Sequence, residues 1–129
     1  MAGAKSFREL AVYRLARREA LRVMRMSQKF PPDEQTSLAE PMREAARSVA
    51  AHIADAWGRR ANPADFSASI VHASGAATSV RAWLDHASDA GYLADQTHES
   101  ADAAWNQVAR MLQTMYESAD EFCEMPIDR

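Results

Sequence analysis

The chain has 129 residues, of which 47% are hydrophobic and 26% are charged, and its formal net charge is −3. This balance is typical of a folded globular domain and excludes a disordered or collagen-like chain. The sequence holds no run of about eighteen apolar residues, so we expect no transmembrane helix. Cys123 is the single cysteine, which excludes an intrachain disulfide and a cysteine-based metal site. The N-terminal residues lack the apolar core of a signal peptide, so we expect a cytoplasmic protein.

The first predicted helix spans residues 6–29. Ser6 and Glu9 have the spacing of a capping box, in which each side chain accepts the backbone N–H of the other residue. Apolar residues then recur every three or four positions, which indicates a helix with one buried face: Val12, Ala16, Ala20 and Val23. Pro31 and Pro32 end the segment, because proline lacks the backbone N–H that would continue a helix.

The second predicted helix spans residues 37–57. Ser37 and Glu40 repeat the capping-box spacing, and Gly58 is placed to end the helix in the left-handed conformation. The apolar stripe of this segment is Leu38, Met42, Ala45, Val49, Ile53 and Ala56. Arg59 and Arg60 follow at the helix end, where the helix dipole favours cations, and they are candidates for contact with an anion or a partner.

The third predicted helix spans residues 63–90. Asn62 is a favourable cap, and Pro63 stands at the first helical position, where its missing N–H costs little. Gly91 is placed to stop the helix. The apolar stripe steps by three and four along the whole segment: Phe66, Ile70, Ala73, Ala77, Val80, Leu84 and Ala87.

The fourth predicted helix spans residues 95–122, with Asp95 as its cap and residues 123–129 as a tail. Its stripe is Ala101, Trp105, Val108, Leu112, Met115, Ala119 and Phe122. Four amphipathic segments joined by short connections favour antiparallel neighbours. We therefore predict an all-α fold, an antiparallel up-down-up-down four-helix bundle, as a single domain over residues 1–129.

Charge is divided unevenly along the chain. Residues 1–60 hold twelve Lys and Arg against seven Asp and Glu, whereas residues 61–129 hold three against eleven. On the first helix the basic residues fall within an arc of roughly 140°, away from the apolar stripe. They are Arg14, Arg17, Arg18, Arg22, Arg25 and Lys29.

Three interpretations of this charge pattern stay open. The first is a solvated surface with salt bridges between helices of one chain. The second is self-assembly, in which the basic face of one subunit meets the acidic face of the next and closes a ring. The third is binding of nucleic-acid phosphates or another anion, for which the candidate residues are Arg14, Arg18, Arg22, Arg25, Arg59 and Arg60. A negative total charge and the lack of interleaved aromatic residues argue against the third.

No residue pattern points to catalysis. The closest approaches to a carboxylate–histidine metal motif are Asp95-x-x-His98 and His52-x-x-Asp55, and neither has a matching copy on another helix. We therefore expect no metal site, no cofactor and no enzymatic activity.

Aromatic residues are favoured in subunit interfaces, which makes Trp57, Trp83 and Tyr92 candidates for contact between copies of the chain.

Three sequence blocks resemble one known family. They are Phe7 to Tyr13, Phe30-Pro31-Pro32-Asp33-Glu34, and His52-Ile53-Ala54-Asp55-Ala56-Trp57-Gly58-Arg59. Together they resemble the four-helix-bundle proteins encoded in intervening sequences of bacterial 23S ribosomal RNA genes. The similarity covers about residues 6–118.

This resemblance implies an antiparallel four-helix bundle, commonly a homopentamer, without established enzymatic activity. A related branch is the accessory variability protein of diversity-generating retroelements, a pentamer whose basic surface binds nucleic acid. We therefore expect a non-enzymatic closed homo-oligomer, with itself as partner. The alternative is an accessory protein that binds RNA or DNA without base specificity through the basic face of the first helix.

Overall fold

Helices make up most of residues 3–123, which are the residues that the computed structural model describes. Four are long: α1 (Ala11–Ser27), α2 (Glu40–Gly58), α3 (Pro63–Asp89) and α4 (Asp95–Glu117). A short helix, α5 (Ala119–Cys123), follows α4. Single helical turns complete the set: η1 (Phe7–Glu9), η2 (Pro32–Glu34) and η3 (Gln35–Ala39). Residues 3–123 contain no strand, so the predicted all-α class is confirmed.

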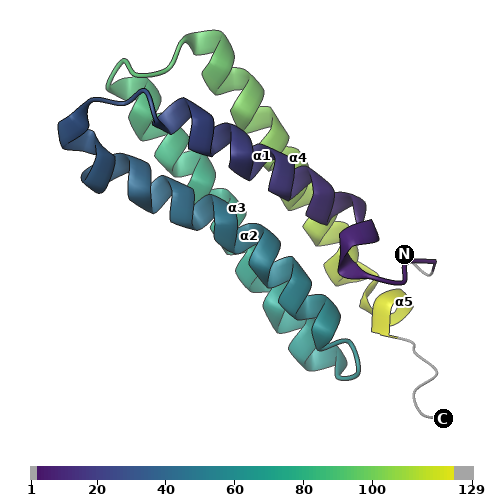
Figure 1. Ribbon diagram of the computed structural model, residues 1–129. Helices are drawn as coiled ribbons and strands as arrows, with labels where there is room; N and C mark the ends of the chain where they lie inside the picture. The colour runs from purple at the N-terminus through teal and green to yellow at the C-terminus, as the bar shows by residue number, and fades with distance from the viewer. Residues whose placement is uncertain (1–2, 124–129) are drawn as a thin grey trace.

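The four long helices lie side by side, and consecutive helices run in opposite directions (Figure 1). Contacts join α1 to α2, α2 to α3, α3 to α4 and α4 back to α1. The predicted stripes meet along the axis enclosed by these helices, where Val23, Ile53, Phe66 and Trp105 are fully buried. Among the described residues, no helix is long and apolar enough to cross a lipid bilayer.

The predicted starts of the first two helices are wrong. Ser6 accepts a hydrogen bond from the backbone N–H of Arg8 (3.1 Å), and Glu9 accepts one from that of Lys5 (3.0 Å). These bonds close the separate turn η1, and α1 begins at Ala11 after the extended residue Leu10. The side chains of Ser6 and Glu9 therefore accept backbone hydrogen bonds at the short turn η1 and not at the start of an α-helix.

Helix α2 is entered through a wider helical turn. The Ser37 hydroxyl donates to the Glu34 carboxylate (2.6 Å), and Ser37 lies inside the π-helical turn η3 that leads into α2. Ser37 therefore does not cap this helix. Gly58 is the last residue of α2. Its φ is not positive, so it does not take the predicted left-handed conformation; among the described glycines, Gly91 does.

Helix α3 begins and ends as its sequence predicts. The Asn62 side chain accepts hydrogen bonds from the N–H groups of Ala64 (3.0 Å) and Asp65 (3.3 Å). At the other end Gly91 has φ 83°, and the N–H of Tyr92 bonds to the carbonyl of Ala87 (2.9 Å). This is the Schellman arrangement, which satisfies a carbonyl left free at the helix end.

The fourth predicted helix is shorter than expected and is split. Asp95 is the first residue of α4 and Ala94 occupies the cap position, so Asp95 is not the cap. The helix is interrupted at Ser118, where the backbone leaves helical geometry, and α5 begins at the next residue. Cys123 ends α5; the rest of the predicted tail, 124–129, lies outside the described residues.

Replacement of Asn62 by Ala should destabilise the α2–α3 junction. The variant loses the acceptor for two N–H groups at the start of α3, so the free energy of unfolding should fall by about 0.5–2 kcal/mol. Urea unfolding followed by circular dichroism measures the difference. Asn62→Asp keeps an acceptor and should lose less, and equal losses in both variants would contradict the capping role.

Phe66 is the largest fully buried side chain of α3, and its ring stacks on Phe122 of α5 with ring centres 5.8 Å apart. Phe66→Ala should therefore lower the free energy of unfolding by about 3–5 kcal/mol through lost burial and a residual cavity. The same urea experiment measures it. Phe66→Leu keeps most of the apolar volume and should cost less than half as much, so a similar loss in both variants would contradict this packing.

Candidate functional site

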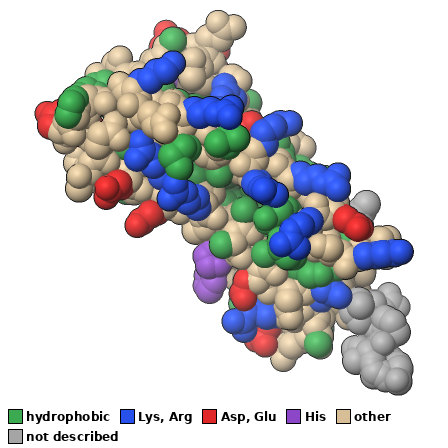
Figure 2. Space-filling model, in the orientation of Figure 1, with side chains coloured by type: hydrophobic (Ala, Val, Ile, Leu, Met, Phe, Trp, Pro, Cys, Tyr) green, Lys and Arg blue, Asp and Glu red, His purple; other side chains and the backbone are tan. Residues whose placement is uncertain are grey.

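The outer face of α1 is basic and has an apolar centre. Basic side chains follow the helix on the face that Figure 2 shows, with apolar side chains between them. The exposed members include Arg14, Arg17, Arg18 and Arg25, and Leu21 among them is 48% exposed. The predicted basic arc on the first helix is thus a real surface. We call it the α1 face.

Two open hollows flank Leu21. One, of about 550 Å³, lies toward α2 and is lined by Arg14, Arg17, Arg18, Ala20, Leu21, Met24 and Arg47. The other, of about 450 Å³, lies toward α4 and is lined by Arg18, Glu19, Leu21, Arg22, Arg25, Met26, Lys29 and Thr97. We call them the α2-side hollow and the α4-side hollow.

Positive charge in the α2-side hollow is largely unbalanced, because among its arginines Arg18 alone lies near a carboxylate, that of Glu19 at 3.6 Å. Four arginines line it and no carboxylate does. Arg14 donates to the backbone carbonyl of Arg8 (2.9 Å), and Arg47 approaches the sulfur of Met24 (3.7 Å), both neutral acceptors. Arginine stays protonated in proteins, so this hollow holds a lasting concentration of positive charge.

The α4-side hollow is partly neutralised by Glu19. This residue is only 4% exposed, and its carboxylate lies 3.4 Å from Arg22 and 3.6 Å from Arg18. The sequence contains a sign of this burial, since Glu19 lies seven residues after Val12 and four before Val23, on the apolar stripe. The sequence analysis did not use it.

Arg59 and Arg60 line neither hollow. Arg59 pairs with Asp55 (2.9 Å), whose carboxylate also accepts the Ser69 hydroxyl (2.8 Å). The hydrogen bond from Ser69, and then that from Arg59, hold the pKa of Asp55 below its usual value. The Arg60 guanidinium lies over the Trp57 ring, 3.8 Å from its centre. Both predicted cations are thus engaged within the chain.

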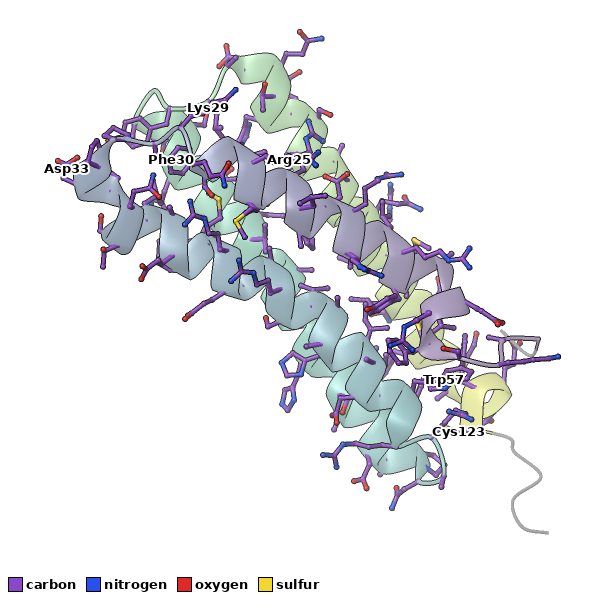
Figure 3. The ribbon with its side chains drawn as sticks, in the orientation of Figure 1. Arg25, Lys29, Phe30, Asp33, Trp57 and Cys123 are labelled. Atoms are coloured by element: carbon purple, nitrogen blue, oxygen red, sulfur yellow. The ribbon has the colours of Figure 1, made fainter. Side chains whose placement is uncertain are left out.

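The three candidate interface aromatics are half-buried. Trp57 lies near Cys123, at the opposite end of the molecule from Lys29 (Figure 3). Tyr92 donates its hydroxyl to Glu34 (2.8 Å), and this bond raises the pKa of Tyr92. Its ring lies 5.4 Å from that of Phe30. Tyr92 therefore joins the α3–α4 turn to the α1–α2 turn; a role of Trp57, Trp83 or Tyr92 between subunits stays a prediction.

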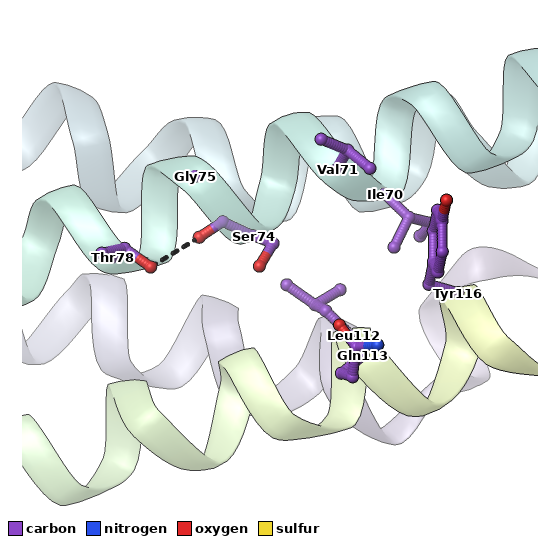
Figure 4. Close-up of a pocket in the computed structure, with 8 residues that line it drawn as sticks. All are labelled: Ile70, Val71, Ser74, Gly75, Thr78, Leu112, Gln113 and Tyr116. Carbon is purple, nitrogen blue, oxygen red and sulfur yellow. Dashed lines mark hydrogen bonds between the residues drawn. The ribbon is translucent and has the colours of Figure 1, made fainter.

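A third hollow, of about 360 Å³, lies between α3 and α4 (Figure 4). It is lined by Ile70, Val71, Ser74, Gly75, Thr78, Leu112, Gln113 and Tyr116. Val71 is 52% and Tyr116 46% exposed; with Leu21 they are the large apolar side chains exposed among residues 3–123. We call it the α3–α4 hollow. The sequence analysis missed it, because a stripe identifies buried positions and not gaps between helices.

Comparison with known proteins now places the chain. The family model of the 23S rRNA-intervening sequence protein matches residues 8–114. The chain belongs to this family. A crystal structure of a protein of unknown function from the S23 ribosomal protein family of Bacteroides thetaiotaomicron is similar to the chain in fold. The TM-score is 0.74 at 20% identity, over 82% of this chain and 95% of that one. Among curated proteins no similar one was found.

Membership in this family confirms the resemblance drawn from the three sequence blocks. The matched residues include all of α1 and α3, and therefore the whole α1 face and the α3 side of the α3–α4 hollow. Tyr116 lies just beyond the match. The relation to the accessory variability protein of diversity-generating retroelements stays a prediction.

Proposed function

We propose that this protein is a non-enzymatic scaffold, an up-down-up-down four-helix bundle that assembles with copies of itself into a closed ring. The observation that carries the proposal is that the exposed large apolar side chains form two separate patches in different electrostatic surroundings. Leu21 lies among arginines on the α1 face, and Val71 and Tyr116 lie at the α3–α4 hollow. The ring size of five comes from the family resemblance.

A closed ring of identical subunits needs two different patches on each subunit, one fitting the other. Leu21 projects from a helix and the α3–α4 hollow is recessed, so a helix of one copy fits the hollow of the next. Gly75 supports this pairing, because a Cβ atom there would meet no atom within 4 Å beyond its neighbours and the backbone of its own helix turns. Glycine within a helix costs about 1 kcal/mol relative to alanine, and contacts within this chain do not explain its presence.

Charge also favours this pairing. The α3–α4 hollow has no charged lining residue, but Gln113 on its rim donates to the carboxylate of Glu117 (2.9 Å). Asp120 and Glu121 follow on α5 and are exposed. A subunit that seats Leu21 in the hollow would bring its arginines toward these carboxylates. Complementary charge of this kind fixes orientation and speeds association.

Light scattering coupled to size-exclusion chromatography tests the proposal on the unmodified chain. We expect a mass of several subunits at micromolar concentration, and five times the 14.3 kDa of one chain if the ring is a pentamer. A mass of one chain under these conditions would overturn it.

A second candidate function is binding of RNA or DNA phosphates on the α1 face. The observation that favours it is the α2-side hollow, which four arginines line and no carboxylate lines. One arginine guanidinium can donate two parallel hydrogen bonds to a phosphate group. Contacts to phosphate carry no base specificity. This function needs an open α1 face, whereas the proposed ring covers it, so the two candidates predict different behaviour of the same variants.

A further inference from the structure

Two histidines face each other across α2 and α3. His52 of α2 and His72 of α3 have ring centres 5.5 Å apart and ring planes inclined by 54°. His52 is half-buried and His72 is exposed, so solvent ions can reach the pair. Figure 2 shows a patch of histidine side chains at the edge of the face in view. Neither the proposed ring contacts nor the candidate nucleic-acid site uses these residues.

The separation of 5.5 Å between the ring centres permits the two imidazoles to bind one metal ion. Imidazole nitrogen binds zinc at about 2.1 Å, which places each ring centre about 3.3 Å from the ion. Two such rings at a tetrahedral ion have centres about 5.3 Å apart. We propose that His52 and His72 together form an open binding site for a late first-row divalent metal ion, with Zn²⁺ as the probe.

One carboxylate, shared with Arg59, lies near the pair. Asp55 lies one turn after His52 and is fixed by hydrogen bonds from Ser69 (2.8 Å) and Arg59 (2.9 Å). Because these bonds hold its pKa below the usual value, Asp55 is ionised at neutral pH and its negative charge acts on His52. Asp55 is already engaged and serves as a neighbouring charge.

The site has two ligands from this chain. Residues 3–123 contain no group of three or more His, Cys, Asp or Glu placed to hold a metal. The remaining coordination positions would be open to water, as in metal sites that exchange their ligands. Imidazole is a good ligand for Zn²⁺, Cu²⁺ and Ni²⁺ and a poor one for Mg²⁺, which prefers oxygen.

Ligand spacings within one helix, and the search for a second copy of a carboxylate–histidine motif, do not reveal this pair, so the sequence predicts no metal site. His52 and His72 lie on different helices, each ten residues from Asn62, which caps α3. The antiparallel turn between α2 and α3 brings positions equally distant from Asn62 to the same level. Asp55 and Ser69, each seven residues from it, are joined by a hydrogen bond for the same reason.

Isothermal titration of the full chain with Zn²⁺ at neutral pH tests the site. We expect one Zn²⁺ per chain, and at least a tenfold loss of affinity in His52→Ala and in His72→Ala. His86→Ala is the matched control, because His86 is also exposed on α3 but its ring lies next to Trp83 and not next to a second histidine. The control should bind as the unmodified chain does, and Mg²⁺ should not bind.

Thermal unfolding supplies a second measurement. Zn²⁺ should raise the unfolding temperature of the unmodified chain and of His86→Ala, but not that of His72→Ala, whose exposed side chain can be removed without opening the core. The proposal is overturned by absence of binding at millimolar Zn²⁺, by equal effects of all three substitutions, or by one Zn²⁺ per two chains.

Discussion

Leu21→Glu is expected to convert the assembled protein into single chains. In the proposed ring Leu21 enters the α3–α4 hollow of the next copy, and a carboxylate there would be buried against apolar side chains close to Glu117. In the separate chain the same carboxylate lies among the arginines of the α1 face, which tolerate it. Folding should therefore be kept while assembly is lost, and light scattering with circular dichroism measures both.

Gly75→Leu tests the same contact from the other side. The Cβ atom has free space in the chain itself, so the new side chain can occupy the α3–α4 hollow and exclude Leu21 of another copy. Its single chain should be at least as stable as the original, because leucine favours a helix more than glycine does. Gln28→Glu adds one negative charge outside the hollows and is the control. Unchanged mass in both Leu21→Glu and Gly75→Leu, or a reduced mass in the control, would refute this interface.

Helix periodicity predicted most of the core, although Ala20, Ala45 and Ala119 of the predicted stripes are only partly buried. The seven stripe residues of the third predicted helix are all buried in α3, because burial of one face is what imposes the period. The start signals were weaker predictors. A serine followed three residues later by a glutamate can satisfy its hydrogen bonds in several ways, and Ser6 and Ser37 both do so outside the start of an α-helix.

The candidate site was only partly predictable, since it depends on neighbours from different helices. The angular plot placed Arg14, Arg17 and Arg18 on one face, but it gave no information that Arg47 of α2 would join them. The angular plot also places Arg22 within the basic arc and does not separate it from the other arginines. The structure distinguishes Arg22 and Arg18 from the others by their proximity to the buried Glu19, at 3.4 Å and 3.6 Å.

That distinction decides which residues to change in a test of nucleic-acid binding. Removal of Arg22 would leave the Glu19 carboxylate buried without its nearest cation, so a loss of binding could reflect a change in folding. Arg18 also lies close to Glu19, at 3.6 Å, and is left unchanged for the same reason. Arg14, Arg17 and Arg47 are exposed and line the α2-side hollow, and they can be replaced without that cost.

The triple variant of Arg14, Arg17 and Arg47 to Glu should strongly weaken binding of a fluorescent single-stranded or duplex oligonucleotide if the α1 face binds nucleic acid. On duplex DNA, log K falls with log salt by about 0.9 per phosphate contact, so three lost contacts should lower the slope by about 2.7. Affinity at low salt should fall at least about 100-fold. Fluorescence anisotropy over a series of salt concentrations measures the slope and the affinity.

The matched control replaces the same three arginines with lysine. Lysine keeps the charge, so contacts that depend on phosphate charge alone should retain most of the affinity and the salt slope. Loss of binding in the lysine variant as well would indicate paired guanidinium–phosphate hydrogen bonds. Binding that is absent from the unmodified chain at low salt, or unchanged by the glutamate substitutions, would exclude the α1 face as a nucleic-acid site. A ring that persists with no such binding would instead be consistent with an α1 face covered by the neighbouring subunit.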